Sequence, residues 1–319
     1  MNKTVLTNEE LQSLENFAYN LAKEAGNKII EAITDPGKLT YKNAKNSSKI
    51  PNNPVTDADK NIEAFIRASI QKEYPEHTII GEEEKPLEIS NNALAWVIDP
   101  IDGTTNFVNQ LPIFGCSIGL MFNNSPIIGA IWISVSHQLT PGVYHANLYS
   151  KIKFNNQSVD INKAKQGIKR GLHTLPYAIP TKHTGSDVRV SGCAVFEITM
   201  LAIGILDGAY LNGMRLWDIA AGIVLLRAGK KEVWIKNTHQ WNKIGNAIDE
   251  PLPLPKKINE IQNWHGTIVA GEKKDIDILK NRFNEKNIIF SLISRLINST
   301  KYLLIAKLKA MANNAMGKS

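Results

Sequence analysis

The segment from Trp96 to Thr105 constrains this chain more than any other part of its sequence. It begins with a short apolar run that is typical of a buried strand, and that strand would end at Asp99. A proline then stiffens the backbone, and Gly103 permits a tight turn or a positive φ. The carboxylates of Asp99 and Asp102 can therefore converge, with the carbonyl of Ile101 between them.

Carboxylates also gather in three other segments, Asp57-Ala58-Asp59, Gly81-Glu82-Glu83-Glu84 and Trp217-Asp218. Taken singly, the first two are equally typical of helix caps and solvated turns. Converging carboxylates repel one another and need protons or cations. A set of oxygen ligands without histidine or cysteine favours Mg²⁺ or Mn²⁺ over zinc. With such cations bound, a phosphate group becomes the natural ligand.

The composition is that of a globular protein, with 319 residues of which 43% are hydrophobic and 21% charged. The formal net charge of +7 indicates an anionic partner, namely nucleic acid, a lipid headgroup or a phosphorylated metabolite. Two cysteines exclude a disulfide scaffold. No secretory signal and no run of eighteen apolar residues is found, so we expect a cytoplasmic protein.

The pattern of apolar residues predicts alternating helices and strands in a layered α/β architecture. A capping box at Thr7 opens a helix that runs to about residue 33. Gly229 is expected at the C′ position of the helix predicted over 218–228. The remaining predicted elements are a loop or hairpin over 35–54, a helix over 56–73, strands over 78–81 and 95–98, an antiparallel meander over 114–135, and helices over 194–204 and 218–228.

Five motifs together resemble the inositol monophosphatase family of Mg²⁺-dependent, lithium-sensitive phosphatases. They occur in the order of that family and span about residues 8–285, and they are Pro54–Asp59, Gly81-Glu82-Glu83, Trp96–Phe107, Trp217–Gly222 and His265–Gly271. The resemblance implies a five-layer αβαβα sandwich. It also implies that metal-activated water hydrolyses a small phosphate monoester, such as inositol monophosphate, without a covalent phosphoenzyme.

The resemblance further implies a role for each matching residue. Two or three Mg²⁺ ions are expected, with Mn²⁺ as the alternative. Their implied ligands are Glu82, Asp99 and the Ile101 carbonyl for the first ion, Asp99, Asp102 and Asp218 for the second, and the neighbourhood of Glu82 and Asp59 for a weaker third. The implied catalytic residues are Thr104, Asp59 and Glu82, and the implied substrate-binding residues are Asp102, Gly103, Thr104, Thr105, Gly192, Cys193 and Ala194.

Three departures from the family pattern bear on the substrate. Leu211 stands where inositol-specific members carry an acid that contacts the inositol hydroxyls. Cys193 stands where serine or threonine is usual, and is expected to be a small residue lining the substrate side. The basic residue expected ahead of Asp59 is Lys42, Lys45 or Lys49. Alternative substrates are therefore histidinol phosphate, fructose 1,6-bisphosphate and 3′-phosphoadenosine nucleotides.

Two competing signals carry less weight. Gly115-Cys116-Ser117-Ile118-Gly119 matches the nucleophile-elbow pattern of serine hydrolases, but a strand and hairpin are predicted to follow where that motif needs a helix. The spacing of His137, His145 and His183 is unlike that of metal ligands, and we expect them in loops or at the surface.

The chain is predicted to divide into a phosphatase domain over 1–286, with halves of about 1–145 and 146–286, and a basic tail over 287–319. The tail carries five positive charges and no acid, which leaves +2 for the rest of the chain. Its apolar residues recur at helical spacing, so we expect an extra amphipathic helix. That helix could pack on its own domain, join a homodimer, or contact an anionic membrane surface or RNA. The alternative function is therefore a transcription- or RNA-associated binding protein.

Overall fold

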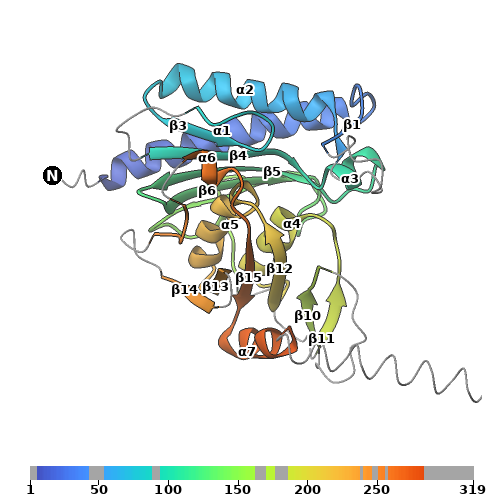
Figure 1. Ribbon diagram of the computed structural model, residues 1–319, viewed down its shortest axis with the longest axis vertical. Helices are drawn as coiled ribbons and strands as arrows, with labels where there is room; N and C mark the ends of the chain where they lie inside the picture. The colour runs from blue at the N-terminus through green and yellow to red at the C-terminus, as the bar shows by residue number, and fades with distance from the viewer. Residues whose placement is uncertain are drawn as a thin grey trace, which may run out of the picture.

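The fold was analysed in a computed structural model (Figure 1). The structure describes residues 6–42, 54–87, 94–161, 170–176, 186–237, 240–245, 251–255 and 258–283. The predicted tail helix, Lys45, Lys49 and His183 lie outside these residues. The division into a domain over 1–286 and a tail stays a prediction.

Two long helices form the first layer, α1 (Asn8–Ala32) and α2 (Asp57–Glu73). The predicted capping box at Thr7 is confirmed, because its side chain accepts a hydrogen bond from the Glu10 amide. The short strands β1 (Thr40–Tyr41) and β2 (Pro54–Val55) follow α1 and precede α2 in the chain, and they pair antiparallel with each other. Both helices cover one face of the first sheet (Figure 1).

The first sheet is the second layer, and its strands follow chain order. They are β3 (Thr78–Gly81), β4 (Leu94–Asp102), β5 (Gly115–Phe122), β6 (Ser125–Ile133), β7 (Gly142–Asn147), β8 (Lys153–Phe154) and β9 (Gln157–Ser158). Only β3 and β4 pair in parallel, and each other neighbouring pair is antiparallel. This confirms the predicted meander.

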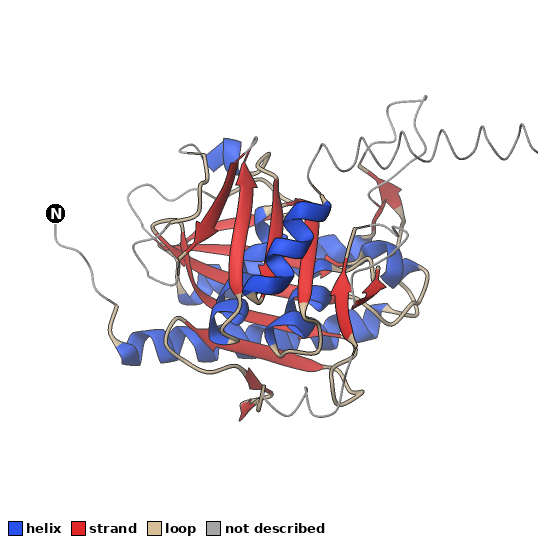
Figure 2. Cartoon of the chain, turned by 90° about the horizontal axis from the view of Figure 1, so that it is seen from below, coloured by secondary structure: helices blue, strands red, loops and turns tan. Residues whose placement is uncertain are grey.

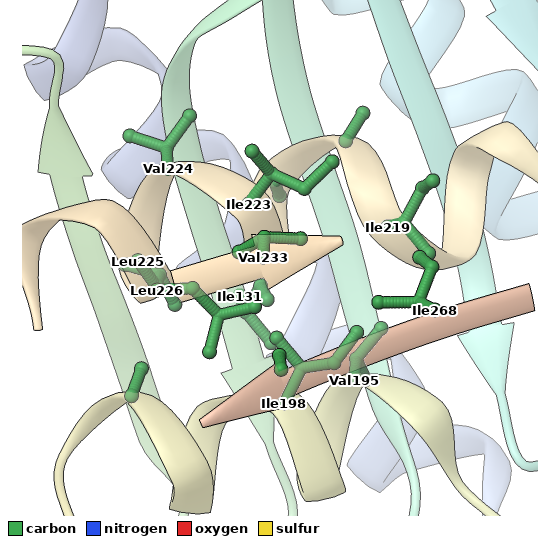
Figure 3. Close-up of a cluster of buried hydrophobic side chains, with 14 of the residues drawn as sticks. Ile131, Val195, Ile198, Ile219, Ile223, Val224, Leu225, Leu226, Val233 and Ile268 are labelled. Carbon is green, nitrogen blue, oxygen red and sulfur yellow. The ribbon is translucent and has the colours of Figure 1, made fainter. Parts of the chain in front are cut away.

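The middle layer consists of α4 (Ala194–Ala202) and α5 (Leu216–Ala228). Both helices are apolar on nearly every side, as expected of helices enclosed between two sheets. Their side chains interdigitate with residues of both sheets, and Figure 3 shows Ile131 of the first sheet and Ile268 of the second around them. This core joins the two halves of the chain.

The second sheet and its covering helix complete five layers, which confirms the predicted αβαβα sandwich. Helix α7 (Lys273–Arg282) contacts the outer face of this sheet (Figure 2). A short helix, α6 (Ile258–Ile261), precedes the last strand. The strands lie in the order β11 (Ser186–Arg189), β10 (Gly171–Thr174), β12 (Gly208–Met214), β15 (Gly266–Gly271), β13 (Glu232–Asn237), β14 (Gln240–Ile244).

Three predictions made from local sequence are wrong in detail. Helix α5 begins at Leu216, so Asp218 is its third residue rather than its first. Gly229 is the C-cap of α5 with φ −79°, not the residue beyond it. His145 was expected in a loop or at the surface but is fully buried in β7. Its Nδ1 atom lies 2.7 Å from Oε1 of the buried Glu15 of α1, which satisfies that polar atom.

Gly229 is required by packing, because a Cβ atom there would lie 2.1 Å from the carbonyl oxygen of Ala202 in α4. We predict that Gly229→Ala lowers the free energy of unfolding by about 1–3 kcal/mol, since overpacking must displace one helix. Urea unfolding measures this change. Asn20→Ala, on the exposed face of α1, is the control and should stay within about 0.5 kcal/mol of wild type. Equal stability of the two variants would contradict the packing account.

Candidate metal centre

Strand register brings the predicted acidic residues together at one edge of the first sheet. Gly81 of β3 pairs with Ile98 of β4 in parallel, so Glu82 and Asp99 follow the paired positions side by side. A register shift in β4 between Asp99 and Asp102 bends the end of that strand. Asp218 arrives from α5, and one carboxylate oxygen from each of Asp99, Asp102 and Asp218 lies within 4.8 Å of the others.

The carboxyl groups of this cluster lie close together and have little contact with water, which makes their ionisation unfavourable. Asp99 is 1% exposed, and its Oδ1 atom has no hydrogen-bond partner. Burial, followed by the charges of Glu82, Asp102 and Asp218, raises the pKa of Asp99 well above its usual value. Burial also raises the pKa of Asp218, with a further contribution from Asp102. A buried carboxylate oxygen without a donor, facing further carboxylates, fits a hard divalent cation.

Two of these carboxylates are held by backbone amides. The amide of Val195 at the start of α4 donates to Oδ2 of Asp102 at 2.6 Å, and the Cys193 sulfur lies 3.2 Å from the same oxygen. Burial raises the pKa of Asp102 to about 6, although these two donors oppose the rise. The Arg215 amide donates to Oδ2 of Asp218 at 2.7 Å.

Asp59 and Thr104 meet beside the cluster although they are far apart in sequence. Asp59 is the third residue of α2, and its Oδ2 atom accepts a hydrogen bond from the Thr56 amide. The Thr104 hydroxyl lies 3.2 Å from Oδ1 of Asp59 and 3.0 Å from the Ile101 carbonyl oxygen. Thr104 begins the short helix α3 (Thr104–Val108), whose N-cap Gly103 has φ +83°, a conformation that favours glycine. Burial is the main cause that raises the pKa of Asp59.

Of the three lysines predicted ahead of Asp59, Lys42 is the one among the described residues, and it lies at this site. Its Nζ atom lies 2.8 Å from Oε1 of Glu82 and 2.9 Å from Oε1 of Glu83. Burial alone would lower the pKa of Lys42, but the charges of both glutamates outweigh it and raise that pKa. Burial raises the pKa of Glu83 to about 7, against the opposing charge of Lys42.

Sequence reasoning missed the residue that shapes the Glu82 turn. Glu63 of α2 is fully buried and accepts hydrogen bonds from the amides of Glu83 at 2.8 Å and Glu84 at 3.0 Å. Arg67, one helical turn further on, donates to it at 2.8 Å. The only signal in the sequence is the i, i+4 spacing of Glu63 and Arg67, which is equally typical of a solvated surface pair.

Two members of the acidic segments lie apart from the cluster. Oδ2 of Asp57 accepts a hydrogen bond from the Lys38 amide at 3.0 Å. The side chain of Glu84 is 57% exposed, and its carboxylate lies 3.9 Å from Arg67. For these two residues the interpretation as helix-end and turn acids is therefore the better one.

The loop before α4, which contains Gly192 and Cys193 and leads into Ala194 at the start of the helix, is anchored from both sides. Asn106 of α3 donates one hydrogen bond of 2.8 Å to the Ser191 carbonyl and another to the Ile113 carbonyl. The Ser191 hydroxyl donates to Oε1 of Glu197 at 2.6 Å. Thr105, in contrast, is exposed on the first turn of α3.

Two further sequence interpretations can be compared with the structure. Leu211 is buried in the core between the two sheets, so its apolar side chain is not available to a substrate. Ser117 is buried inside β5, which continues to Phe122 and turns into β6 without a helix. The context required by a serine-hydrolase elbow is therefore absent at this motif.

Known proteins similar to this chain carry the names of inositol monophosphatases and of a Nus factor. Nus factor SuhB of Escherichia coli K12 is 31% identical over 246 residues, covering 73% of this chain and 89% of that protein. Human inositol monophosphatase 1 is 29% identical over 236 residues, covering 68% and 82%.

Solved structures show the same fold. Inositol monophosphatase from Anabaena matches with a TM-score of 0.61 and 25% identity, over 85% of this chain and 95% of that chain. SaIMPase-II bound to 2′-AMP matches with a TM-score of 0.60 and 25% identity, over 89% and 99%. A sequence profile of the inositol monophosphatase family matches residues 10–229. This chain belongs to the inositol monophosphatase family.

Proposed function

We propose that this protein is a Mg²⁺-dependent phosphatase that hydrolyses a small phosphate monoester. The observation that carries the proposal is the cluster of Asp99, Asp102 and Asp218, in which Asp99 is buried, the other two are half-buried, and one Asp99 oxygen has no hydrogen-bond partner among the described residues. Members of the family are phosphatases, and three carboxylates with no imidazole ligand suit Mg²⁺, with Mn²⁺ as a substitute.

The residues present divide naturally between two cation positions. Glu82, Asp99 and the Ile101 carbonyl would hold one ion, while Asp99, Asp102 and Asp218 would hold the other, with a weaker third position near Asp59. Bound divalent cations would acidify a coordinated water and neutralise charge on the leaving oxygen. Lys42 now pairs with Glu82, so its ammonium group would exchange that contact for a substrate phosphate or for Glu83 alone.

The chain's own residues would orient the attacking water. The Thr104 hydroxyl has an acceptor on each side, because it lies between Asp59 and the Ile101 carbonyl, and its own oxygen lone pairs stay available. It can therefore accept a hydrogen bond from water while it donates to Asp59. The amides of Gly103 and Thr104, with Thr105 beside them, would donate to phosphate oxygens.

The leaving group remains a choice between several small molecules. Leu211, which is buried, stands where inositol-specific members carry an acid that accepts hydrogen bonds from inositol hydroxyl groups. This difference supports a search beyond inositol monophosphate. SaIMPase-II binds 2′-AMP, which makes nucleoside phosphates suitable members of a substrate panel. The panel also includes histidinol phosphate, fructose 1,6-bisphosphate and 3′-phosphoadenosine nucleotides.

A second candidate function is an association with transcription. Relatives from Pasteurella multocida, Vibrio cholerae and Haemophilus influenzae, like that from Escherichia coli, are named Nus factor SuhB. A role of this kind is compatible with phosphatase chemistry. The helices of the described residues include none with the length and apolar character to cross a membrane. Co-purification with RNA polymerase or RNA, with and without residues 287–319, tests this candidate.

Turnover by this protein should require Mg²⁺. Purified protein should release phosphate from at least one panel substrate only when Mg²⁺ is present, and Li⁺ should inhibit the release. Asp99→Asn should lower kcat by at least about 100-fold, because it removes a charge shared by both cation positions. Asp57→Asn is the matched control and should retain activity, because Asp57 only binds the Lys38 amide. Absence of Mg²⁺-dependent turnover on every substrate would contradict the proposal.

The stability of the metal-free protein should depend on the ionisation of the acidic cluster. Because the pKa of Asp102 is about 6 in the folded state, it keeps its proton at pH values where the unfolded chain has lost it. The contribution of Asp102 to folding stability is therefore largest below about pH 4 and is lost as the pH rises towards 6. Asp99 and Asp218 contribute in the same direction.

Urea unfolding in EDTA at pH 4.5 and pH 7.5 measures this dependence. Asp99→Asn should be more stable than wild type at pH 7.5 by at least about 1 kcal/mol, because it removes one buried charge. Added Mg²⁺ should stabilise wild type and leave the variant nearly unchanged. A metal-free wild type at least as stable as Asp99→Asn at pH 7.5 would show that the cluster is not under electrostatic strain.

A further inference from the structure

Asp102 is held by the half of the chain to which it does not belong. It lies at the end of β4, but two donors to its Oδ2 atom come from the start of α4, the Val195 amide at 2.6 Å and the Cys193 thiol at 3.2 Å. Helix α4 has no side-chain cap of its own. Asp102 therefore caps α4 while it also belongs to the carboxylate cluster.

The two donors fix the rotation of this carboxylate. Both bonds end on Oδ2, so they hold the side chain without engaging its other oxygen. A neutral thiol is a weak donor, but a bond to an ionised acceptor is strengthened by the charge. The orientation of Asp102 relative to Asp99 and Asp218 thus depends in part on the residue at position 193.

Cys193 has little freedom to point elsewhere. It is 2% exposed, and its own amide donates to the Ser191 hydroxyl, which Glu197 holds in turn. A Cβ atom added to Gly103 would lie only 3.1 Å from the Cβ atom of Cys193. The thiol therefore lies between the Gly103 turn and the Asp102 carboxylate.

We propose that Cys193 is a positioning residue whose thiol orients Asp102 and thereby sets the affinity of the site for divalent cations. This inference rests on the proposed function, because it requires the carboxylate cluster to bind a cation. Cys193 then acts neither as a nucleophile nor through contact with the substrate. Residues that orient metal ligands commonly change metal affinity by about 10–100-fold when they are replaced.

The test is a titration of the full chain with Mn²⁺, in which electron paramagnetic resonance reports the free ion independently of turnover. Cys193→Ala removes the donor but leaves the Val195 amide bond, so the cap of α4 survives. It should weaken Mn²⁺ binding at least about fivefold. Cys193→Ser restores a donor in the same place and should bind Mn²⁺ within about twofold of wild type.

Two additional variants separate the hydrogen bond from packing. Cys193→Val fills the thiol's space without a donor and should bind Mn²⁺ as weakly as Cys193→Ala. Cys116→Ala removes the other thiol of the chain from the apolar core of β5 and should keep wild-type affinity. Thermal unfolding in EDTA confirms that each variant is folded before the titration.

The outcomes distinguish this inference from the proposed function. If wild type binds no Mn²⁺, the proposed metal centre itself is wrong. If wild type binds and both Cys193→Ala and Cys193→Val bind equally well, or if Cys193→Ser binds as weakly as they do, the positioning role is overturned. A raised KM for substrate at saturating Mn²⁺ with unchanged Mn²⁺ affinity would also overturn it, because that result assigns Cys193 to substrate contact.

Discussion

Repulsion among the clustered carboxylates of Asp99, Asp102 and Asp218 limits how the surrounding fold can be built. Asp99 has almost no access to water, and Asp102 and Asp218 bring further negative charge within 4.8 Å. Such an arrangement is costly in a metal-free protein, because Oδ1 of Asp99 is buried and has no hydrogen-bond partner among the described residues. A fold that keeps it intact must hold each carboxylate by other means.

The two halves of the chain supply those means to each other. The first half contributes β3 and β4, whose parallel register places Glu82 beside Asp99. The second half contributes Asp218 on α5 and, through α4, the amide that holds Asp102. The apolar core around α4 and α5 locks the halves together (Figure 3), so the geometry of the site depends on the packing of the whole sandwich.

Sequence reasoning succeeded where the decisive residues are close in the chain. Asp99 and Asp102 could be paired from a strand, a proline and a glycine within eight residues. Asp59 and Thr104 are 45 residues apart, and only the resemblance to a family predicted their meeting. The layer order was likewise predicted through that resemblance, because periodicity shows which residues are apolar but not which sheet they face.

What the sequence could not predict are contacts between distant polar groups. Lys42 could be assigned to the site only once the Glu82 turn was placed beside it, whereas Lys45 and Lys49 lie outside the described residues. His145 was expected at the surface because nothing near it in sequence identifies Glu15 as its partner. The bond from Cys193 to Asp102 spans 91 residues and joins the two halves of the fold. Folding creates such pairs, so no local pattern announces them.

Diffraction can show whether this acidic cluster is a divalent-cation centre. Crystals soaked in Mn²⁺ and measured at the manganese absorption edge should show an anomalous peak enclosed by Asp99, Asp102 and Asp218. A second peak should lie between Asp99 and Glu82, and both should vanish in Asp99→Asn. Mn²⁺ peaks elsewhere, with none among these carboxylates, would contradict the account.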